Sequence, residues 1–198
     1  MNKRLLDIFV SFLGLLFLFP ILLTFAFFVW IYDRKNPLYI AERVGKNGVS
    51  FNMIKLRSMK VNADKSGVDS TSQNDPRITP VGKLIRKYKL DEFTQLINVL
   101  RGSMSLVGPR PNVILETKLY SEIEKRILSV RPGITDIASI VFSDESKILK
   151  GFNNPDIAYN QLIRPGKSKL ALFYIKKSSF ILDISLIFVT IISIFSRS

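Results

Sequence analysis

The sequence contains no histidine and no cysteine. The absence of histidine removes the most common general base of enzymes, and the absence of cysteine removes the thiol nucleophile. Without cysteine the chain also cannot form disulfides or thiolate zinc sites, which favours an intracellular or cytoplasm-facing protein. Any chemistry must therefore be carried by carboxylates, hydroxyls, lysines or arginines, and any metal must be a hard cation bound to oxygen ligands.

Acidic residues are scarce relative to basic ones. The 198 residues include 16 Asp and Glu against 29 Lys and Arg, which gives a net charge of +13. This excess predicts attraction to polyanions such as nucleic acid, an anionic membrane surface or a phosphorylated substrate. Because no nucleic-acid-reading motif is present, we expect no nucleic acid among the partners.

A long segment without any charged side chain runs from residue 8 to residue 32. It is long enough to cross a bilayer core of about 30 Å, and too long for the apolar region of a cleaved signal peptide, which is about 7 to 15 residues. Basic residues flank both of its ends, and Pro20 lies near its middle. These features predict a re-entrant helix-break-helix with both ends on the cytoplasmic side; a proline-kinked spanning helix is the alternative.

The remaining sequence predicts a mainly helical α+β protein. Residues 38–57 alternate around an Asn47-Gly48 turn and predict a β-hairpin, whereas the polar residues 61–76 predict a loop. An amphipathic basic helix is expected over 81–90, a second helix over 113–130 and an apolar interfacial helix over 180–195. We therefore divide the chain into a re-entrant membrane hairpin (1–35), a cytoplasmic domain (36–178) and a C-terminal apolar helix (179–198).

Two adjacent carboxylates, Asp91 and Glu92, stand at the predicted start of a helix that continues through Leu100. On an ideal helix they point about 100° apart, and acidic residues at a helix N-terminus are commonly present only to complement the helix dipole. Their setting favours a phosphate site, because Arg86 precedes them and Arg110 follows in a Gly-Pro-Arg-Pro motif. A rigid turn with an exposed arginine is the alternative for Arg110.

The tripeptide Arg-Pro-Gly occurs twice, at 131–133 and at 164–166. Neither the Gly-Pro-Arg-Pro motif nor RPGIT (131–135) resembles a Walker loop, a dinucleotide-binding fingerprint or a metalloprotease motif, so the familiar nucleotide and zinc folds gain no support.

The ordered motifs along the chain resemble the bacterial sugar transferases called monotopic phosphoglycosyl transferases. They are RVGKNGVSF (43–51), KLRSM (55–59), DPRITPVGKLIR (75–86), LDEFTQLINVLRGSMSLVGPRP (90–111), RPGIT (131–135) and LDISLIFVT (182–190). The resemblance implies transfer of a phospho-sugar from a UDP-sugar to polyprenol phosphate, with release of UMP and with Mg²⁺ as cofactor. It also implies a location at the bacterial inner (cytoplasmic) membrane, with the catalytic domain on the cytoplasmic face and in contact with phospholipid; a homodimer is left open.

The same resemblance assigns roles to individual residues. Asp91 would be the nucleophile and would contact the metal, and Glu92 would assist or position. Arg86 and Arg110 would bind phosphates, with Arg131, Lys55 and Arg57 as further candidates. This assignment agrees with the residue inventory, since carboxylate nucleophiles, cations and Mg²⁺ suffice for phosphoryl transfer.

The sequence departs from the family pattern at three places. Phe19 replaces the serine that often precedes the helix-breaking proline, Phe93-Thr94 replaces Leu-Pro, and Asp136 replaces a glycine. Residues 134–145 and 163–170 resemble a branch that favours N-acetylated deoxy sugars. The alternative to an enzyme is a membrane-anchored basic module that binds anionic lipid or another polyanion without catalysis.

Overall fold

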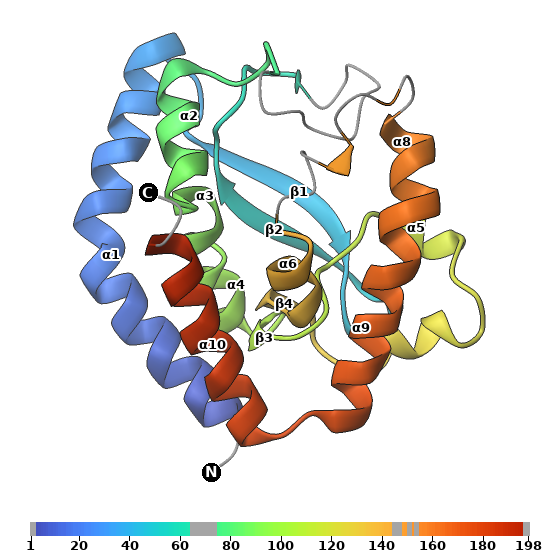
Figure 1. Cartoon of the computed structure of the whole chain (residues 1–198). Helices are drawn as coiled ribbons and strands as arrows, with labels where there is room; N and C mark the ends of the chain where they lie inside the picture. Colours follow the sequence, from blue (N-terminus) through green and yellow to red (C-terminus); the bar gives the residue numbers. More distant parts are fainter. Residues whose placement is uncertain (1–2, 64–74, 144–147, 150–151, 153–154, 196–198) are drawn as a thin grey trace.

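A computed structural model of the chain describes residues 3–63, 75–143, 148–149, 152 and 155–195 (Figure 1). Most of the predicted loop at 61–76 therefore lies outside the described residues. The mainly helical α+β class is confirmed. In chain order the elements are α1 (Lys3–Asp33), β1 (Leu38–Val44), η1 (Lys46–Gly48), β2 (Ser50–Leu56), α2 (Pro80–Lys87), α3 (Leu90–Phe93), α4 (Leu96–Arg101), β3 (Ser105–Val107), α5 (Ile114–Lys118), η3 (Glu124–Ser129), β4 (Gly133–Thr135), α6 (Ile137–Val141), α8 (Pro155–Ala158), η4 (Tyr159–Ile163), α9 (Arg164–Lys177) and α10 (Phe180–Phe195).

The N-terminal helix α1 is continuous over 31 residues and includes Pro20. The predicted break in the helix at this proline is therefore not found. A proline inside a helix removes one backbone hydrogen bond, and a long helix can keep its course when its other bonds remain. Within the described part of the chain, α1 is the one helix long and apolar enough to cross a membrane by length and composition.

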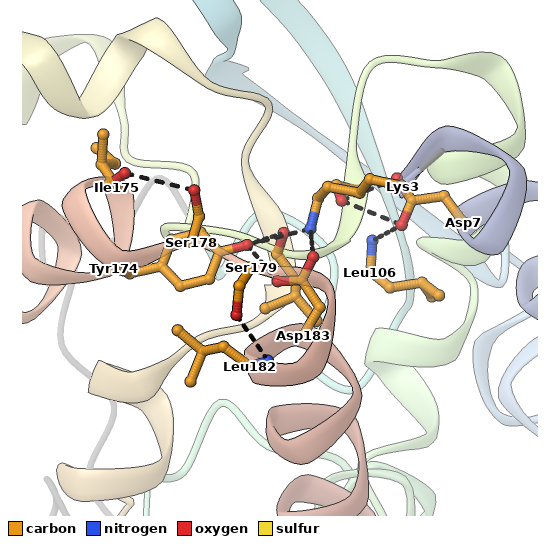
Figure 2. A network of polar contacts seen from close by, with 11 residues as sticks. Lys3, Asp7, Leu106, Tyr174, Ile175, Ser178, Ser179, Leu182 and Asp183 are labelled. Carbon is orange, nitrogen blue, oxygen red and sulfur yellow. Dashed lines mark hydrogen bonds and ion pairs between the residues drawn. The ribbon is translucent and has the colours of Figure 1, made fainter. Parts of the chain in front are cut away.

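A buried polar network binds the start of α1 to the rest of the protein (Figure 2). The ammonium group of Lys3 lies 2.5 Å from the Asp183 carboxylate of α10, which also accepts a 2.6 Å hydrogen bond from the Tyr174 hydroxyl of α9. One turn further along α1, Asp7 accepts a hydrogen bond of 3.0 Å from the backbone N–H of Leu106 in β3. Three distant segments thus meet at the N-terminal end of α1.

Both ends of α1 are bonded to the same body. Near its start, the Arg4 guanidinium donates to the carbonyl oxygens of Val99 and Leu100 at 2.6 and 3.0 Å, where α4 ends. At its other end, Asp33 forms a two-point ion pair with Arg57, with N–O distances of 2.5 and 2.7 Å. The basic residues at the N-terminus therefore belong to the folded structure as well as to the charge pattern around the apolar segment.

The predicted β-hairpin is confirmed. Strands β1 and β2 pair antiparallel, with Leu38 opposite Leu56 and Val44 opposite Ser50. The reversal uses left-handed conformations at Asn47 (φ 58°) and Gly48 (φ 78°), which asparagine and glycine adopt more readily than other residues.

The single helix predicted over 113–130 is wrong. The structure has α5, which ends at Lys118, and a separate 3₁₀ segment η3, which begins at Glu124. Ser121 starts the second segment, because its backbone N–H and its hydroxyl both donate to the Glu124 carboxylate at 2.9 and 3.0 Å. Such local side-chain bonds compete with helix continuation.

The helix predicted from Leu90 is also interrupted, at Thr94 and Gln95, between α3 and α4. Thr94 donates to the carbonyl oxygens of Ile54 (3.0 Å) and Asp91 (3.1 Å). Thr94, at the interruption, therefore fastens α3 to strand β2. The C-terminal helix predicted over 180–195 is confirmed as α10.

Two glycines allow β3 and β4 to approach closely enough to pair in parallel. A Cβ atom on Gly133 would lie 2.1 Å from the backbone nitrogen of Gly108, and one on Gly108 would lie 2.5 Å from the carbonyl oxygen of Arg131. Gly108 begins the Gly-Pro-Arg-Pro motif, so this crossing fixes the backbone that carries Arg110.

Replacing the central glycine of this crossing is expected to be costly. Gly133→Ala would press a methyl group against rigid backbone atoms, and we expect it to lower the free energy of unfolding by at least about 2 kcal/mol. Chemical denaturation of the purified protein measures the loss. Gly48→Asn is the control, because a Cβ atom there meets no atom within 4 Å and asparagine tolerates the left-handed region. Equal stability of the two variants would contradict the close crossing.

Candidate active site

The carboxylate pair lies on the short helix α3, which begins directly after a sharp reversal of the chain. Lys89 adopts a left-handed conformation (φ 56°), an uncommon state for a residue other than glycine. The next residue, Leu90, is buried in a hydrophobic cluster with Val29, Leu56 and Ile85. This anchor holds the first turn of α3 against β2 and α2, and the carboxylates of Asp91 and Glu92 follow it.

Glu92 forms an ion pair with Arg110. The two side chains are 2.8 Å apart, and 15% of the Glu92 side chain and 41% of the Arg110 side chain are exposed. Burial on its own would raise the pKa of Glu92, but Arg110, Lys89 and Lys55 outweigh burial and hold this pKa far below its usual range. Glu92 is therefore a permanently ionised partner of Arg110 at neutral pH.

The pKa of Asp91 is shifted in the opposite direction to that of Glu92. Burial, with the neighbouring Glu92 charge, raises the pKa of Asp91, while Lys55, Lys89 and Arg86 partly offset the rise. Its Oδ1 atom is buried and has no hydrogen-bond partner among the described residues. Buried polar atoms in folded proteins are nearly always paired, so an unpaired carboxylate oxygen beside several cations indicates a site that binds something.

Lys55 and Arg86 are two further cations close to the carboxylates of Asp91 and Glu92. Burial, with the nearby Arg110, lowers the pKa of Lys55, whereas Glu92 and Asp91 act to raise it. Lys55 is on β2 and Arg86 is on the last turn of α2. Four of the residues predicted from the sequence thus come together with Lys55: Asp91, Glu92, Arg86 and Arg110.

The other two candidate cations are engaged elsewhere in the structure. Arg57 is buried and bound to Asp33 and to the carbonyl oxygen of Asn36. Arg131 is exposed, and its Nε donates to the carbonyl oxygen of Gly102 at 2.8 Å. Neither contact involves the carboxylate pair, and a phosphate-binding role for these two residues stays a prediction.

Asp136 positions Arg110, a role that the sequence did not suggest. Its carboxylate accepts a hydrogen bond of 2.6 Å from the backbone N–H of Ser139 at the start of α6, and another of 3.2 Å from the backbone N–H of Arg110. Asp136 was noted only because the family usually has glycine there. Its place before a helical segment is the available signal, since aspartate is a preferred N-cap residue.

Asn98 is a second positioning residue that was missed. It is buried, and its amide oxygen accepts from the backbone N–H of Ile54 (2.9 Å) while its amide nitrogen donates to the carbonyl oxygen of Asn52 (2.7 Å). Asn98 and Thr94 therefore pair with the outer edge of β2 and hold Lys55 opposite the carboxylates.

The donor atoms present fit a magnesium ion. Mg²⁺ is commonly bound by one or two carboxylates together with substrate phosphates, and Asp91 offers an unpaired carboxylate oxygen. Within the described residues, no group of three or more His, Cys, Asp or Glu side chains comes together that could hold a metal on its own. Asp91, with Glu92 beside it, is therefore the place where this chain would hold Mg²⁺, and substrate would have to complete the coordination.

Removing the positive charge of Lys55 is expected to weaken activity mainly at low pH. Lys55 acts to lower the pKa of Asp91, so Lys55→Met should raise that pKa and move the acid limb of the kcat/KM profile to higher pH. We expect at least about a tenfold loss at pH 7 and a smaller loss under alkaline conditions. Lys60→Met, at an exposed position, is the control. An acid limb that does not move would contradict the electrostatic role of Lys55.

Comparison with known proteins shows the family to which the chain belongs. The family model described as bacterial sugar transferase matches residues 1–197. An uncharacterized sugar transferase of Haemophilus influenzae is 36% identical over 98% of this chain and 41% of its own length, and the exopolysaccharide production protein PSS of Rhizobium leguminosarum bv. phaseoli is 35% identical over 98% and 96%. The UDP-glucose:undecaprenyl-phosphate glucose-1-phosphate transferase of Escherichia coli is 34% identical over 96% of this chain and 39% of its own length. The chain thus spans about two fifths of the H. influenzae and E. coli relatives, and it belongs to the bacterial sugar transferase family.

Proposed function

We propose that this protein transfers a phospho-sugar from a UDP-sugar to undecaprenyl phosphate, releasing UMP, through a covalent intermediate on Asp91. The observation that carries the proposal is the unpaired, buried Oδ1 of Asp91 within a group of cations. The acceptor is inferred from the E. coli relative, whose name gives undecaprenyl phosphate as its acceptor. The same name supports a UDP-linked donor.

In the first step, a carboxylate oxygen of Asp91 forms a bond to the β-phosphorus of the UDP-sugar. The bond from this phosphorus to the oxygen that bridges to the α-phosphate breaks, and UMP leaves with the electron pair. In the second step, an ionised oxygen of undecaprenyl phosphate attacks the same phosphorus. The bond to Asp91 then breaks and restores the carboxylate. Neither attack needs a strong base, because a carboxylate attacks as its anion and the acceptor phosphate is mostly ionised near neutral pH.

Glu92 and Arg110 have distinct roles in this scheme. Arg110 can contact a phosphate with the part of its guanidinium group that Glu92 does not occupy, since 41% of its side chain is exposed. Glu92 holds that guanidinium in place and, through its charge, raises the pKa of Asp91. A Mg²⁺ ion bound at Asp91 would supply further neutralisation of phosphate charge.

We also propose that α1 lies in one leaflet of the bacterial inner membrane, with the catalytic domain on the cytoplasmic face. Both ends of α1 are bonded to one body, through Lys3 and Asp183 at one end and Asp33 and Arg57 at the other. A helix that crossed the bilayer would carry its ends to opposite sides and break one set of bonds. The lipid-facing surface would be formed by exposed apolar side chains of α1 and of α10, which lies beside it in Figure 1: Phe9, Phe12, Leu16, Phe17, Phe19, Leu23, Ile181, Phe188 and Ile192.

Accessibility of the two ends of α1 tests this arrangement. Cysteines introduced at positions 2 and 36 should both react with a membrane-impermeant thiol reagent only when the reagent can reach the cytoplasmic side of the membrane. The labelling is specific to these positions, because the chain has no cysteine of its own. Labelling of the two positions from opposite sides would show that α1 spans the membrane and would reject the arrangement.

The catalytic proposal is tested by UMP release. Membranes containing the protein, incubated with undecaprenyl phosphate and a panel of UDP-sugars that includes N-acetylated deoxy sugars, should release UMP with at least one donor. The alternative, a basic module that only binds anionic lipid, predicts salt-dependent binding and no UMP with any donor. The panel also identifies the sugar.

A further inference from the structure

A cavity is lined by Arg110 but not by Asp91 or Glu92. It contains about 470 Å³ of empty space, including its opening to solvent, and is formed by α6, α9, η4 and the segment after the Gly-Pro-Arg-Pro motif. In Figure 1, α9 and α1 lie at opposite edges of the molecule. The polar side chains that line the cavity include Arg110, Asn112, Ser139, Tyr159, Arg164 and Lys167.

The wall formed by α9 contains features that simple packing does not require. The helix is preceded by a π-helical segment over Tyr159–Ile163, a rare backbone form that occurs often at functional sites. The second Arg-Pro-Gly tripeptide begins at Arg164, whose buried Nε atom has no hydrogen-bond partner among the described residues. An unsatisfied buried donor is unfavourable, and a ligand oxygen would remove that cost.

The cations that line the cavity suit a phosphate. Arg110, Arg164 and Lys167 line it together with two carboxylates, Glu116 and Asp136. Asp136 is already used to bind the backbone N–H groups of Arg110 and Ser139. The cavity therefore shares Arg110 with the carboxylate site and adds two further cations, and the Lys167 ammonium lies 5.0 Å from the centre of the Tyr159 ring.

We propose that this cavity binds the UMP part of the donor, with Lys167 and Arg164 facing its phosphate and Tyr159 beside its nucleoside. The inference rests on the proposed function, because it takes the donor to be a UDP-sugar. In phosphoryl transfer the leaving group lies opposite the attacking atom. Arg110 connects the two places, since it is bonded to Glu92 next to Asp91 and also lines the cavity.

Binding of UMP to the purified full-length chain in detergent tests the proposal without turnover. Titration calorimetry should show about a tenfold weaker UMP affinity for Lys167→Gln, as expected for the loss of one charge-assisted contact to phosphate. The affinity for uridine, which has no phosphate, should change by less than about twofold. Lys169→Gln is the matched control, because Lys169 is exposed on the same helix and does not line the cavity. Its UMP affinity should equal that of the wild type.

The outcomes separate this inference from the proposed function. Wild-type UMP affinity in a folded Lys167→Gln variant would overturn the inference. A change in the preferred sugar without a change in UMP affinity would also overturn it, since the cavity would then hold the sugar. Failure of the wild type to release UMP from any UDP-sugar would instead overturn the proposed function. Arg164→Lys, which keeps the charge and changes the geometry, should also weaken UMP binding. If Lys167→Gln does not fold, wild-type UMP affinity of Arg164→Lys would overturn the inference.

Discussion

Asp91→Asn is expected to abolish phospho-sugar transfer, with a loss of at least about 10³-fold, without lowering the stability of the protein. The loss follows from removing the nucleophile of a reaction that proceeds through it. Stability should be kept because asparagine has nearly the same shape and carries no charge. In the wild type, burial and the Glu92 charge raise the pKa of Asp91, so the ionised carboxylate destabilises the folded state.

The stability part of this prediction depends on pH. A group whose pKa is raised on folding favours the folded state below its unfolded pKa, and this advantage is lost as the pH rises through the folded pKa. The Tm of Asp91→Asn, measured by calorimetry without added metal, should therefore rise relative to that of the wild type as the pH increases through the pKa of Asp91.

Asp75→Asn is a matched substitution whose expected effect on the Tm has the opposite sign. Its carboxylate accepts hydrogen bonds from Arg77, at distances of 2.6 to 3.1 Å, and these bonds lower its pKa. Asp75→Asn should therefore lower the Tm at neutral pH, where Asp91→Asn does not. A clear loss of stability in Asp91→Asn would contradict the description of Asp91 as a buried carboxylate with an unpaired oxygen.

Arg110→Ala has the second largest expected effect. It removes a proposed phosphate ligand and leaves the Glu92 charge without its ion-pair partner, so we expect kcat/KM to fall by about 10² to 10³-fold, together with a lower Tm. Arg110→Lys should recover only part of the activity, because lysine lacks the planar guanidinium fork. Steady-state kinetics with UMP release as the readout measures both losses.

A double-mutant cycle separates the structural part of the Arg110 effect from its catalytic part. Adding Glu92→Gln to Arg110→Ala should restore stability, because it removes the uncompensated charge, but it should not restore transfer. Arg126→Ala, at an exposed position in η3, is the control and should leave both quantities unchanged. Recovery of transfer in the double variant would show that Arg110 acts only by neutralising Glu92.

The elements that were predictable from the sequence are those specified by local chemistry. The hairpin at 38–57 depends on alternation and on an Asn-Gly turn, and α10 depends on a long apolar run. Of the two breaks in the predicted helices, the one before η3 coincides with local bonds between Ser121 and Glu124, whereas the one at Thr94 coincides with a bond that a local pattern does not reveal. At the interruption after the carboxylates, Thr94 donates to the carbonyl oxygen of Ile54, forty residues earlier in the chain.

The candidate site was partly predictable for a similar reason. Asp91, Glu92, Arg86 and Arg110 lie within a single block of sequence, and family motifs point to them directly. Asp136 and Asn98 act through the backbone of other segments, so their roles become visible only when β2, α6 and the Gly-Pro-Arg-Pro segment are seen together.

The basic residues at the start of α1 have a structural role in addition to their place beside the apolar segment. In the sequence, Lys3 and Arg4 form one of the two basic flanks that predict both ends of the apolar segment on the cytoplasmic side. In the structure Lys3 is bonded to Asp183, 180 residues away, and Arg4 binds the carbonyl oxygens at the end of α4. These bonds also explain the presence of an aspartate within the apolar helix α10.

The covalent intermediate is the central claim, and it can be measured directly. The purified protein is incubated with its UDP-sugar, labelled in the β-phosphate, in the presence of Mg²⁺ and without undecaprenyl phosphate. The account predicts release of about one equivalent of UMP per protein and recovery of the label on the peptide that contains Asp91, by mass spectrometry. If no peptide carries the label and UMP appears only after undecaprenyl phosphate is added, the transfer is a single direct displacement and the role assigned to Asp91 is wrong.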